Sequence, residues 1–311
     1  MSEALITPGV YPGLPMAEYL SMPAVSASLL TAIARECPRA AWWQSWLNPQ
    51  PPADDSTDAT DAGTIAHGIL LEGSEQGISL GDFPDWRTKD AKAWRESIRA
   101  LGNIPILAHK MPPIRAMVAE ARRYLDEDVQ PVEPAVWAAF QPGGGESETT
   151  IVWQDGETLC RIRPDRLSAD RKLIVDYKTG GTTAEPDTWG RTQMVRMGYY
   201  MSAAFYARGI EATFGVQPDY VFLVQEQEPP YLCSLVGTDP HAFELGAAKI
   251  NFALDLWQRC VKTGKWSGYP GRVVYPELPA WEQANWEERQ SVDEYEGKMF
   301  GAKDLDAGVP L

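Results

Sequence analysis

Residues 161–179 read RIRPDRLSADRKLIVDYKT, two short apolar runs that each end in charged side chains. The turn-like residues 168–171 (SADR) lie between them, so the stretch predicts two antiparallel strands joined by a short turn. Asp165 would lie on the first strand. Asp176 and Lys178 would share one face of the second strand, because side chains alternate along a strand. Neighbouring antiparallel strands place their side chains within reach of one another, so the spacing predicts a cluster of two carboxylates and one ammonium.

This predicted cluster indicates a metal site. Uncompensated buried ions are costly, so a bound cation is expected to neutralise the carboxylates. Mg²⁺ binds a few carboxylates together with water and phosphate oxygens, and Asp165, Asp176 and the Tyr177 carbonyl could supply the protein ligands. Metal-assisted phosphodiester hydrolysis also needs a group that stabilises hydroxide and the growing negative charge, which suits the ammonium of Lys178. The alternative is a surface hairpin whose Asp–Lys ion pair contributes little.

The flanking segments predict an α/β core with a helical N-terminal elaboration. A β-meander is expected from strands at 132–140, 149–154, 158–167 and 172–179, with a hairpin turn at Asp155-Gly156, followed by strands at 220–225 and 231–236. Helices are expected at 26–37, 39–47, 64–72, 89–101, 111–125, 188–208 and 243–262, and an exposed loop at 48–63. We expect a single domain over 1–311, with a mainly helical part (1–131), the α/β core (132–264) and a C-terminal segment packed by its aromatic residues (265–311).

Composition and charge limit the class of protein. The 311 residues carry 28 basic and 43 acidic side chains, a net charge of −15, which on average repels nucleic acid. A basic groove or bound divalent cations would override that average at short range. Neither an apolar run long enough to span a membrane nor a signal peptide is visible, so a soluble intracellular protein is expected. The four cysteines are scattered and predict neither a disulfide framework nor a zinc ribbon.

Four stretches together resemble one family. RIRPDRL, LIVDYKT, the earlier GTIAHGILLEG and the later GYYMSAAFYARGIEATFGVQPDYVFLV resemble the PD-(D/E)XK nuclease superfamily, and within it the RecE-type exonuclease VIII proteins of phages and prophages. The resemblance implies a restriction-endonuclease-like core, in which a mixed central sheet is flanked by helices. It also implies an exonuclease that requires Mg²⁺, with Mn²⁺ expected to support activity, and that degrades linear double-stranded DNA from 5′ ends. The 3′ overhangs would serve a RecT-type single-strand annealing protein. The enzyme would be a ring-shaped homo-oligomer, a tetramer, in the cytoplasm of a bacterial host.

The resemblance also implies roles for single residues. Asp165 and Asp176 match the metal-binding acids, and Lys178 matches the catalytic lysine. His67 matches a histidine that ligates the metal or contacts one of its ligands, although a lone histidine on an apolar helix is otherwise a packing residue. Glu133, which would open the first strand, is a weaker candidate for a carboxylate linked to the metal.

One position departs from the pattern of the relatives. Ser202 stands where they often carry glutamine, and Gln193 lies more than two helical turns upstream, too far to substitute for it. The contact that this glutamine makes in relatives is therefore in doubt for this chain.

Other residues are candidates for DNA contacts. Ser26 and Ser28 begin a predicted helix, where hydroxyls and free N–H groups could bind a terminal phosphate or cap the helix. Arg161 and Arg163 would share the face of Asp165 and could bind the phosphate backbone. Tyr199, on the helix that follows the hairpin, could touch DNA or a catalytic water.

Arg166 would point to the opposite face and act structurally. Two other functions stay open. A RecB-like single-strand or structure-selective nuclease would use the same site. A non-catalytic binding or DNA-mimic protein with this fold would suit the acidic charge, but the intact Asp/Asp/Lys set argues against it.

Overall fold

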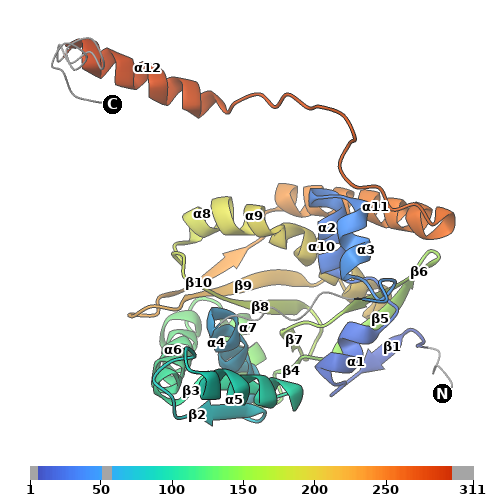
Figure 1. Ribbon diagram of the computed structural model, residues 1–311. Coiled ribbons are helices and arrows are strands. Elements are labelled where there is room, and N and C mark those ends of the chain that lie inside the picture. Colours follow the sequence, from blue (N-terminus) through green and yellow to red (C-terminus); the bar gives the residue numbers. More distant parts are fainter. Residues whose placement is uncertain (1–5, 51–57, 296–311) are drawn as a thin grey trace. The chain divides into compact units, whose positions relative to one another are not determined.

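The computed structural model describes residues 6–50 and 58–295 (Figure 1). The chain divides into two compact units, Met1–Gly268 and Tyr269–Leu311, and the elements discussed below belong to the first unless stated otherwise.

A five-stranded mixed sheet forms the centre of the first unit. Its strand order is β10-β9-β8-β7-β4, with β8 and β9 parallel and the other pairs antiparallel. The strands are β4 (Gly145–Ser147), β7 (Arg166–Ser168), β8 (Leu173–Gly180), β9 (Asp219–Glu226) and β10 (Cys233–Gly237). β8 begins with the continuous apolar run Leu173-Ile174-Val175, typical of a strand that is buried on both faces. The predicted mixed sheet is therefore confirmed.

Two smaller sheets complete the strands. β1 (Gly9–Tyr11), β5 (Thr150–Asp155) and β6 (Thr158–Ile162) form an antiparallel sheet in the order β1-β5-β6. The hairpin predicted at Asp155-Gly156 is present, but Asp155 still pairs with Thr158, so the two-residue turn between β5 and β6 is Gly156-Glu157. Gly156 has the positive φ (58°) that such a turn favours. β2 (Ile78–Gly81) and β3 (Ile104–Leu107), which the sequence did not predict, pair in parallel.

The prediction of one strand over 158–167 is wrong. β6 ends at Ile162 in one sheet, and β7 begins at Arg166 in another. Pro164 lies between them, and a proline cannot donate a hydrogen bond to a strand ladder. Asp165 therefore lies in a break between two strands, and the expected alternation that placed it on one face with Arg161 and Arg163 does not hold.

Helices cover both faces of the central sheet (Figure 1). Ile174 and Phe222 face a core shared with α2 (Ala27–Arg35), α10 (Tyr199–Phe214) and α11 (Pro240–Thr263). Val175 and Tyr177 face the opposite core, shared with α4 (Asp58–His67), α6 (Met111–Arg123) and α7 (Pro134–Phe140). The remaining helical segments are α1 (Met16–Ser21), α3 (Pro38–Gln44), η1 (Gly68–Glu72), α5 (Lys89–Ala100), η2 (Ala108–Lys110), η3 (Tyr124–Val129), α8 (Pro186–Trp189), η4 (Gly190–Met194), α9 (Val195–Met197) and α12 (Ala280–Tyr295).

Four further expectations differ from the structure. The predicted strand 132–140 is helix α7, whose first position is Pro134, a favoured residue there. The predicted helix 188–208 is interrupted at Gly198, which has a positive φ of 73°. The expected loop 48–63 contains the start of α4, and its residues 51–57 lie outside the described residues. The C-terminal segment 265–311 was expected to be packed by its aromatic residues rather than by regular structure, but it contains the helix α12, and its residues 296–311 lie outside the described residues.

None of the helices in residues 6–50 and 58–295 is long and apolar enough to cross a membrane.

The crossing of α10 and α11 depends on Gly246. A Cβ atom there would lie 2.5 Å from the Tyr200 carbonyl oxygen, a backbone atom that cannot move alone. Glycine to alanine in a helix normally stabilises by up to about 1 kcal/mol. We expect Gly246→Ala instead to lower the free energy of unfolding by about 1–3 kcal/mol, measured by urea denaturation.

Gly190→Ala is the matched control, because its Cβ would meet no neighbour closer than 3.9 Å and its φ of −60° is helical. Equal stability changes in the two variants would contradict this account of the crossing.

Candidate active site

The candidate site lies at the edge of β8 where β7 stops. β7 pairs with β8 at only two positions, Arg166 with Val175 and Leu167 with Ile174. Beyond them, the Asp165 carboxylate takes the place of a strand partner, because its Oδ2 accepts a hydrogen bond from the Tyr177 backbone N–H at 2.8 Å. The break in the chain at Pro164 thus positions Asp165 against β8.

Asp176 and Lys178 share one face of β8, as predicted. The Lys178 ammonium donates to Asp176 Oδ1 at 2.5 Å, and the Tyr220 hydroxyl on β9 donates to Asp176 Oδ2 at 2.8 Å. Asp176 is only 6% exposed, and each of its two carboxylate oxygens accepts a hydrogen bond from another side chain.

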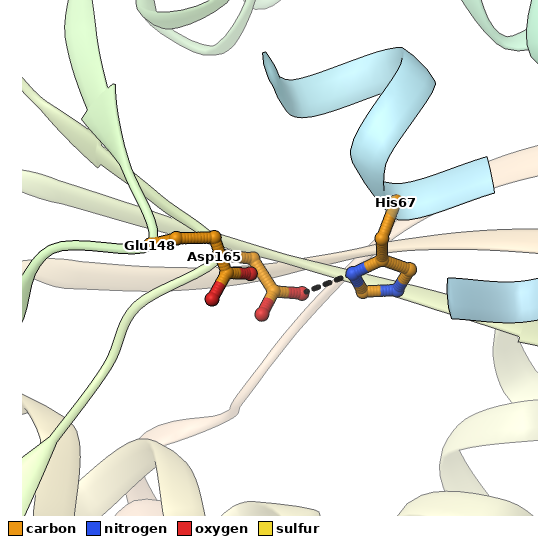
Figure 2. A group of neighbouring side chains, drawn as sticks. All are labelled: His67, Glu148 and Asp165. Atoms are coloured by element: carbon orange, nitrogen blue, oxygen red, sulfur yellow. Dashed lines mark ion pairs between the residues drawn. The ribbon is translucent and has the colours of Figure 1, made fainter. Parts of the chain in front are cut away.

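His67 enters the site from the C-terminal end of α4 (Figure 2). Its Nδ1 lies 3.5 Å from Asp165 Oδ2, and its ring packs against the Tyr177 ring with centroids 4.8 Å apart. Tyr177 points to the other face of β8, where its hydroxyl donates to Gln225 Oε1. The Tyr177 ring therefore supports the histidine that faces the carboxylate.

Glu148 is a site residue that the sequence did not reveal. The structure brings three possible metal ligands together: His67, Glu148 and Asp165 (Figure 2). Each offers one ligand atom, and these three atoms lie within 4.8 Å of one another, a spacing that could hold a metal ion. Glu148 has a positive φ of 52°, which is rare for a residue with a side chain, and its N–H donates to the Pro164 carbonyl at 3.1 Å. The only signal in the sequence is a glutamate between two strands, and its partners depend on the tertiary fold.

Two of the four predicted metal ligands lie in a compact donor group. Among the described His, Cys, Asp and Glu side chains, this group joins His67 and Asp165 with Glu148. The roles of Asp176, which holds Lys178 and Tyr220, and of the Tyr177 carbonyl as metal ligands stay predictions.

Burial and neighbouring charges shift the ionisation of the site. Burial, together with the charge of Asp176, raises the pKa of Asp165 well above its usual value. Burial disfavours the charged form of Asp176, but the charge of Lys178 and the hydrogen bonds that Asp176 accepts together outweigh burial, so the pKa of Asp176 is lowered. The pKa of Lys178 is raised by the two aspartates despite its burial. Burial and the charge of Lys178 lower the pKa of His67 to about 4, so its imidazole is neutral near pH 7 and can ligate a metal.

A cavity of about 880 Å³, which we call the active cavity, opens onto these groups. It is also lined by Arg163 and Tyr199. The Lys178 ammonium lies 5.2 Å from the centre of the Tyr199 ring, and Arg163 donates to Glu148 Oε2 at 2.7 Å. Two of the predicted DNA contacts thus border the site.

The other three predicted DNA contacts line a second cavity, of about 680 Å³. The hydroxyls of Ser26 and Ser28 lie 2.8 Å apart at the start of α2. Arg161 is only 5% exposed and donates to the backbone carbonyls of Leu20 and Met22, so it is not the exposed strand residue that was expected. Tyr19 lines both this cavity and the active cavity, so the two are neighbours.

Glu133 does not join the carboxylates. It precedes α7 and lines a cavity with Asp170 and Lys172, which come before β8. It was expected near the metal because 132–140 was interpreted as a strand, and that interpretation is wrong.

Three other residues are placed away from the reacting groups. Arg166 donates to the Ala139 carbonyl and to Ser147, a structural role as expected. Gln193 accepts a hydrogen bond from Arg196. Ser202 lies on α10, partly buried.

Metal binding tests the donor group directly. We expect His67→Ala and Glu148→Gln each to weaken the affinity for Mn²⁺ roughly tenfold or more, because each removes one of three converging ligands. Electron paramagnetic resonance of free Mn²⁺ measures this without turnover. Glu133→Gln is the matched control and should bind as the unmodified protein does. Unchanged binding in both test variants would reject this donor group.

The low pKa of His67 has a consequence for stability. Its folded pKa is about 4 against 6.5 for an ordinary histidine, so the unfolded chain binds more protons between these values. Above about pH 6.5 the imidazole is neutral in both states, so it does not change the free energy of unfolding. As the pH falls toward about 4, the unfolded chain takes up the proton first and the free energy of unfolding decreases. We expect His67→Gln to lose less stability than the unmodified protein between about pH 7 and about pH 5 in urea denaturation. His241→Gln, an exposed control, should follow the unmodified protein, and parallel losses in all three proteins would refute the neutral, partly buried imidazole.

Comparisons with known proteins agree with this geometry. A family model described as a PDDEXK-like domain of unknown function (DUF3799) matches residues 26–279. A crystal structure of a protein from Eubacterium rectale, described there as a candidate exonuclease, shares the fold, with a TM-score of 0.55, 12% identity and coverage of 86% of this chain and 94% of that one. An alkaline exonuclease from Laribacter hongkongensis matches 64% of this chain and 95% of its own at 15% identity, but its TM-score of 0.23 carries no argument. No curated protein matches the chain.

The family model covers most of the chain, and the mixed sheet bearing Asp165, Asp176 and Lys178 is the fold that the resemblance predicted. The chain therefore belongs to the DUF3799 family of PDDEXK-like domains, which confirms the predicted PD-(D/E)XK nuclease superfamily and its class of enzyme, the phosphodiester hydrolases.

Proposed function

We propose that this protein is a Mg²⁺-dependent exodeoxyribonuclease that degrades linear double-stranded DNA from 5′ ends and leaves 3′ single-stranded overhangs. One observation carries the proposal. At the edge of β8, the donor group of His67, Glu148 and Asp165 lies beside the hydrogen-bonded pair of Asp176 and Lys178. These are the groups that metal-assisted hydrolysis of a phosphodiester requires.

The donor group fits a hard divalent cation. It offers two carboxylates and one neutral imidazole, a set that suits Mg²⁺ or Mn²⁺. The raised pKa of Asp165 reflects excess negative charge in a buried place, which a cation would relieve. A divalent ion held there would polarise the phosphoryl oxygen and lower the pKa of the attacking water.

Lys178 is suited to stabilise the negative charge that grows on the phosphoryl group. Asp176 orients its ammonium and keeps it protonated, and the Tyr220 hydroxyl holds Asp176 in turn. Because the ammonium is already in place, it stabilises charge without reorganisation during the reaction. Water is the nucleophile in this proposal. His67 and Asp165 would hold the metal together with Glu148, and Asp176 and the Tyr177 carbonyl are further candidate ligands.

The neighbouring cavity supports entry from a 5′ end. It combines the start of α2, two hydroxyls from Ser26 and Ser28, and the buried Arg161, whose Nε has no hydrogen-bond partner among the described residues. Backbone N–H groups at a helix start and a guanidinium suit a terminal phosphate. Arg163 and Tyr199, which border the active cavity, would then contact the strand that is cut.

The resemblance to RecE-type proteins extends the proposal to partners. We propose that the enzyme acts as a ring-shaped tetramer in the cytoplasm of a bacterial host and supplies 3′ overhangs to a RecT-type annealing protein. A ring would let the acidic outer surface stay away from DNA while a locally basic interior meets it.

Digestion of end-labelled linear duplex DNA tests the reaction. With Mg²⁺, we expect early release of a 5′ label as nucleotides, whereas a 3′ label should stay on the shortened strand. Covalently closed circles should not be cut. Lys178→Ala should lower the single-turnover rate by at least about 100-fold, because the charge that stabilises the transition state is lost. Lys172→Ala, a lysine outside the site, is the matched control.

The other outcomes are equally informative. Cutting of circles would favour the structure-selective nuclease. Full activity of Lys178→Ala would reject the assigned site. A well-folded protein that is inactive with every divalent ion and substrate would favour the binding protein.

A further inference from the structure

A basic surface lies outside the residues used so far. Between positions 86 and 115 the chain carries seven basic and two acidic residues, although its net charge is −15. The segment contains α5, β3 and the start of α6. Arg95 and Arg99 pair with Asp61, and Arg115 pairs with Glu75. The positive charge that remains to attract a polyanion is therefore that of the exposed lysines, for which the described residues show no ion pair.

Two adjoining cavities lie on this surface. One, of about 500 Å³, is lined by four basic residues, one acidic residue and Trp86: Arg87, Lys92, His109, Lys110 and Asp85. Asp85 lies 3.6 Å from Arg87, so the two lysines supply the unpaired charge. Arg87, Lys92, His109 and Lys110 are exposed.

The other cavity, of about 460 Å³, is largely apolar and shares lining residues with the first. Trp86, Leu107 and Lys110 line both, and Pro105 and Tyr231 belong to the second alone. We call the two cavities together the basic groove. Gln227 lines both the apolar part of the groove and the active cavity, so the groove leads away from the reacting groups.

Trp86 is held firmly in the wall of the groove. Its ring stacks on Trp94 with centroids 6.0 Å apart and an interplanar angle of 12°, and Arg95 lies 5.2 Å from its centre. Trp86 also lines both cavities, so part of its side chain faces the groove and can contact a base without losing side-chain entropy on binding.

The combination of charge and aromatic surface selects the ligand. Lysines and an arginine can follow a phosphate backbone, and an aromatic wall can stack on bases. Bases of a duplex are already stacked and paired, so only a single strand would use the ring of Trp86 and the apolar wall beside it.

We propose that the basic groove binds a single strand of DNA where it leaves the active cavity. This inference rests on the proposed function, which supplies the single strand. Lys92 and Lys110 contact phosphates, and Trp86 stacks on a base.

Binding without turnover tests the groove. The protein carries Lys178→Ala, and fluorescence anisotropy follows a labelled oligothymidylate of about 20 nucleotides over a range of salt concentrations, a length that spans common single-strand sites. We expect the double variant Lys92→Ala/Lys110→Ala to bind more weakly and to reduce the slope of log affinity against log salt by about 1.4, because two phosphate contacts are lost. Lys262→Ala/Lys265→Ala, which removes two exposed lysines at the far end of α11, should change neither.

The aromatic contact is tested separately. We expect Trp86→Ala to weaken binding about fivefold or more, and Trp86→Phe, which keeps a stacking surface, to restore most of it. Thermal unfolding shows whether each variant is folded. If Trp86→Ala is not, Trp86→Leu, which keeps an apolar side chain but has no stacking ring, should bind more weakly than Trp86→Phe, and equal affinities of these two variants would overturn the aromatic contact.

Equal affinities of the lysine variant and its control would overturn the proposal. The proposal would also be overturned if the lysine variant lost as much affinity for duplex DNA as for the single strand, because this would indicate a general attraction of phosphates. Because no turnover is involved, failure of binding alongside active unmodified enzyme rejects the groove alone. Intact groove binding with inactive unmodified enzyme rejects the proposed nuclease instead.

Discussion

The hydrogen bond from the Tyr177 N–H to Asp165 is the contact on which the site depends. β8 is buried on both faces, so its backbone groups need partners, yet β7 pairs with it at only two positions. The chain turns at Pro164, and the Asp165 side chain accepts the hydrogen bond that a strand would otherwise accept. One carboxylate thus completes the sheet and faces His67 at the same time. The sheet edge and the candidate metal-binding group therefore share one carboxylate.

Charge balance governs the rest of the site. Two buried carboxylates close together would destabilise the fold, and the structure compensates one of them fully. Asp176 is bonded to the ammonium of Lys178 and the hydroxyl of Tyr220, whereas Asp165 shares its surroundings with Glu148 and a neutral histidine. Asp176 holds the lysine, whereas Glu148 is paired with Arg163 and Asp165 accepts a backbone hydrogen bond beside His67. Two aspartates that look equivalent in the sequence thus have different partners.

The acidic composition and a DNA substrate are compatible because the positive charge is local. Arg163 borders the active cavity and Arg161 the adjoining one, while the basic groove gathers the exposed lysines of α5 and η2. Fields at such distances are set by near charges, since salt screens the distant ones. The average charge describes how the molecule behaves in solution, and the cavities determine what it can bind.

By itself, the sequence determined the elements and the spacing of the reactive groups. The apolar run before Asp176 predicted β8, alternation put Lys178 on the same face, and the long amphipathic stretch after Asp239 predicted α11. These features are local, because periodicity and turn chemistry act over a few residues.

Only the tertiary structure decided which groups meet. Contacts between segments far apart in the chain bring Glu148 into the site and bury Arg161. Such contacts also place Glu133 in a different cavity, away from the carboxylates. A proline break moved Asp165 out of the strand in which the pattern placed it, and a helix formed where aromatic and β-branched residues suggested a strand. Such outcomes follow from packing and from the pairing of backbone groups across the fold, and a local pattern of residue types carries no information about either.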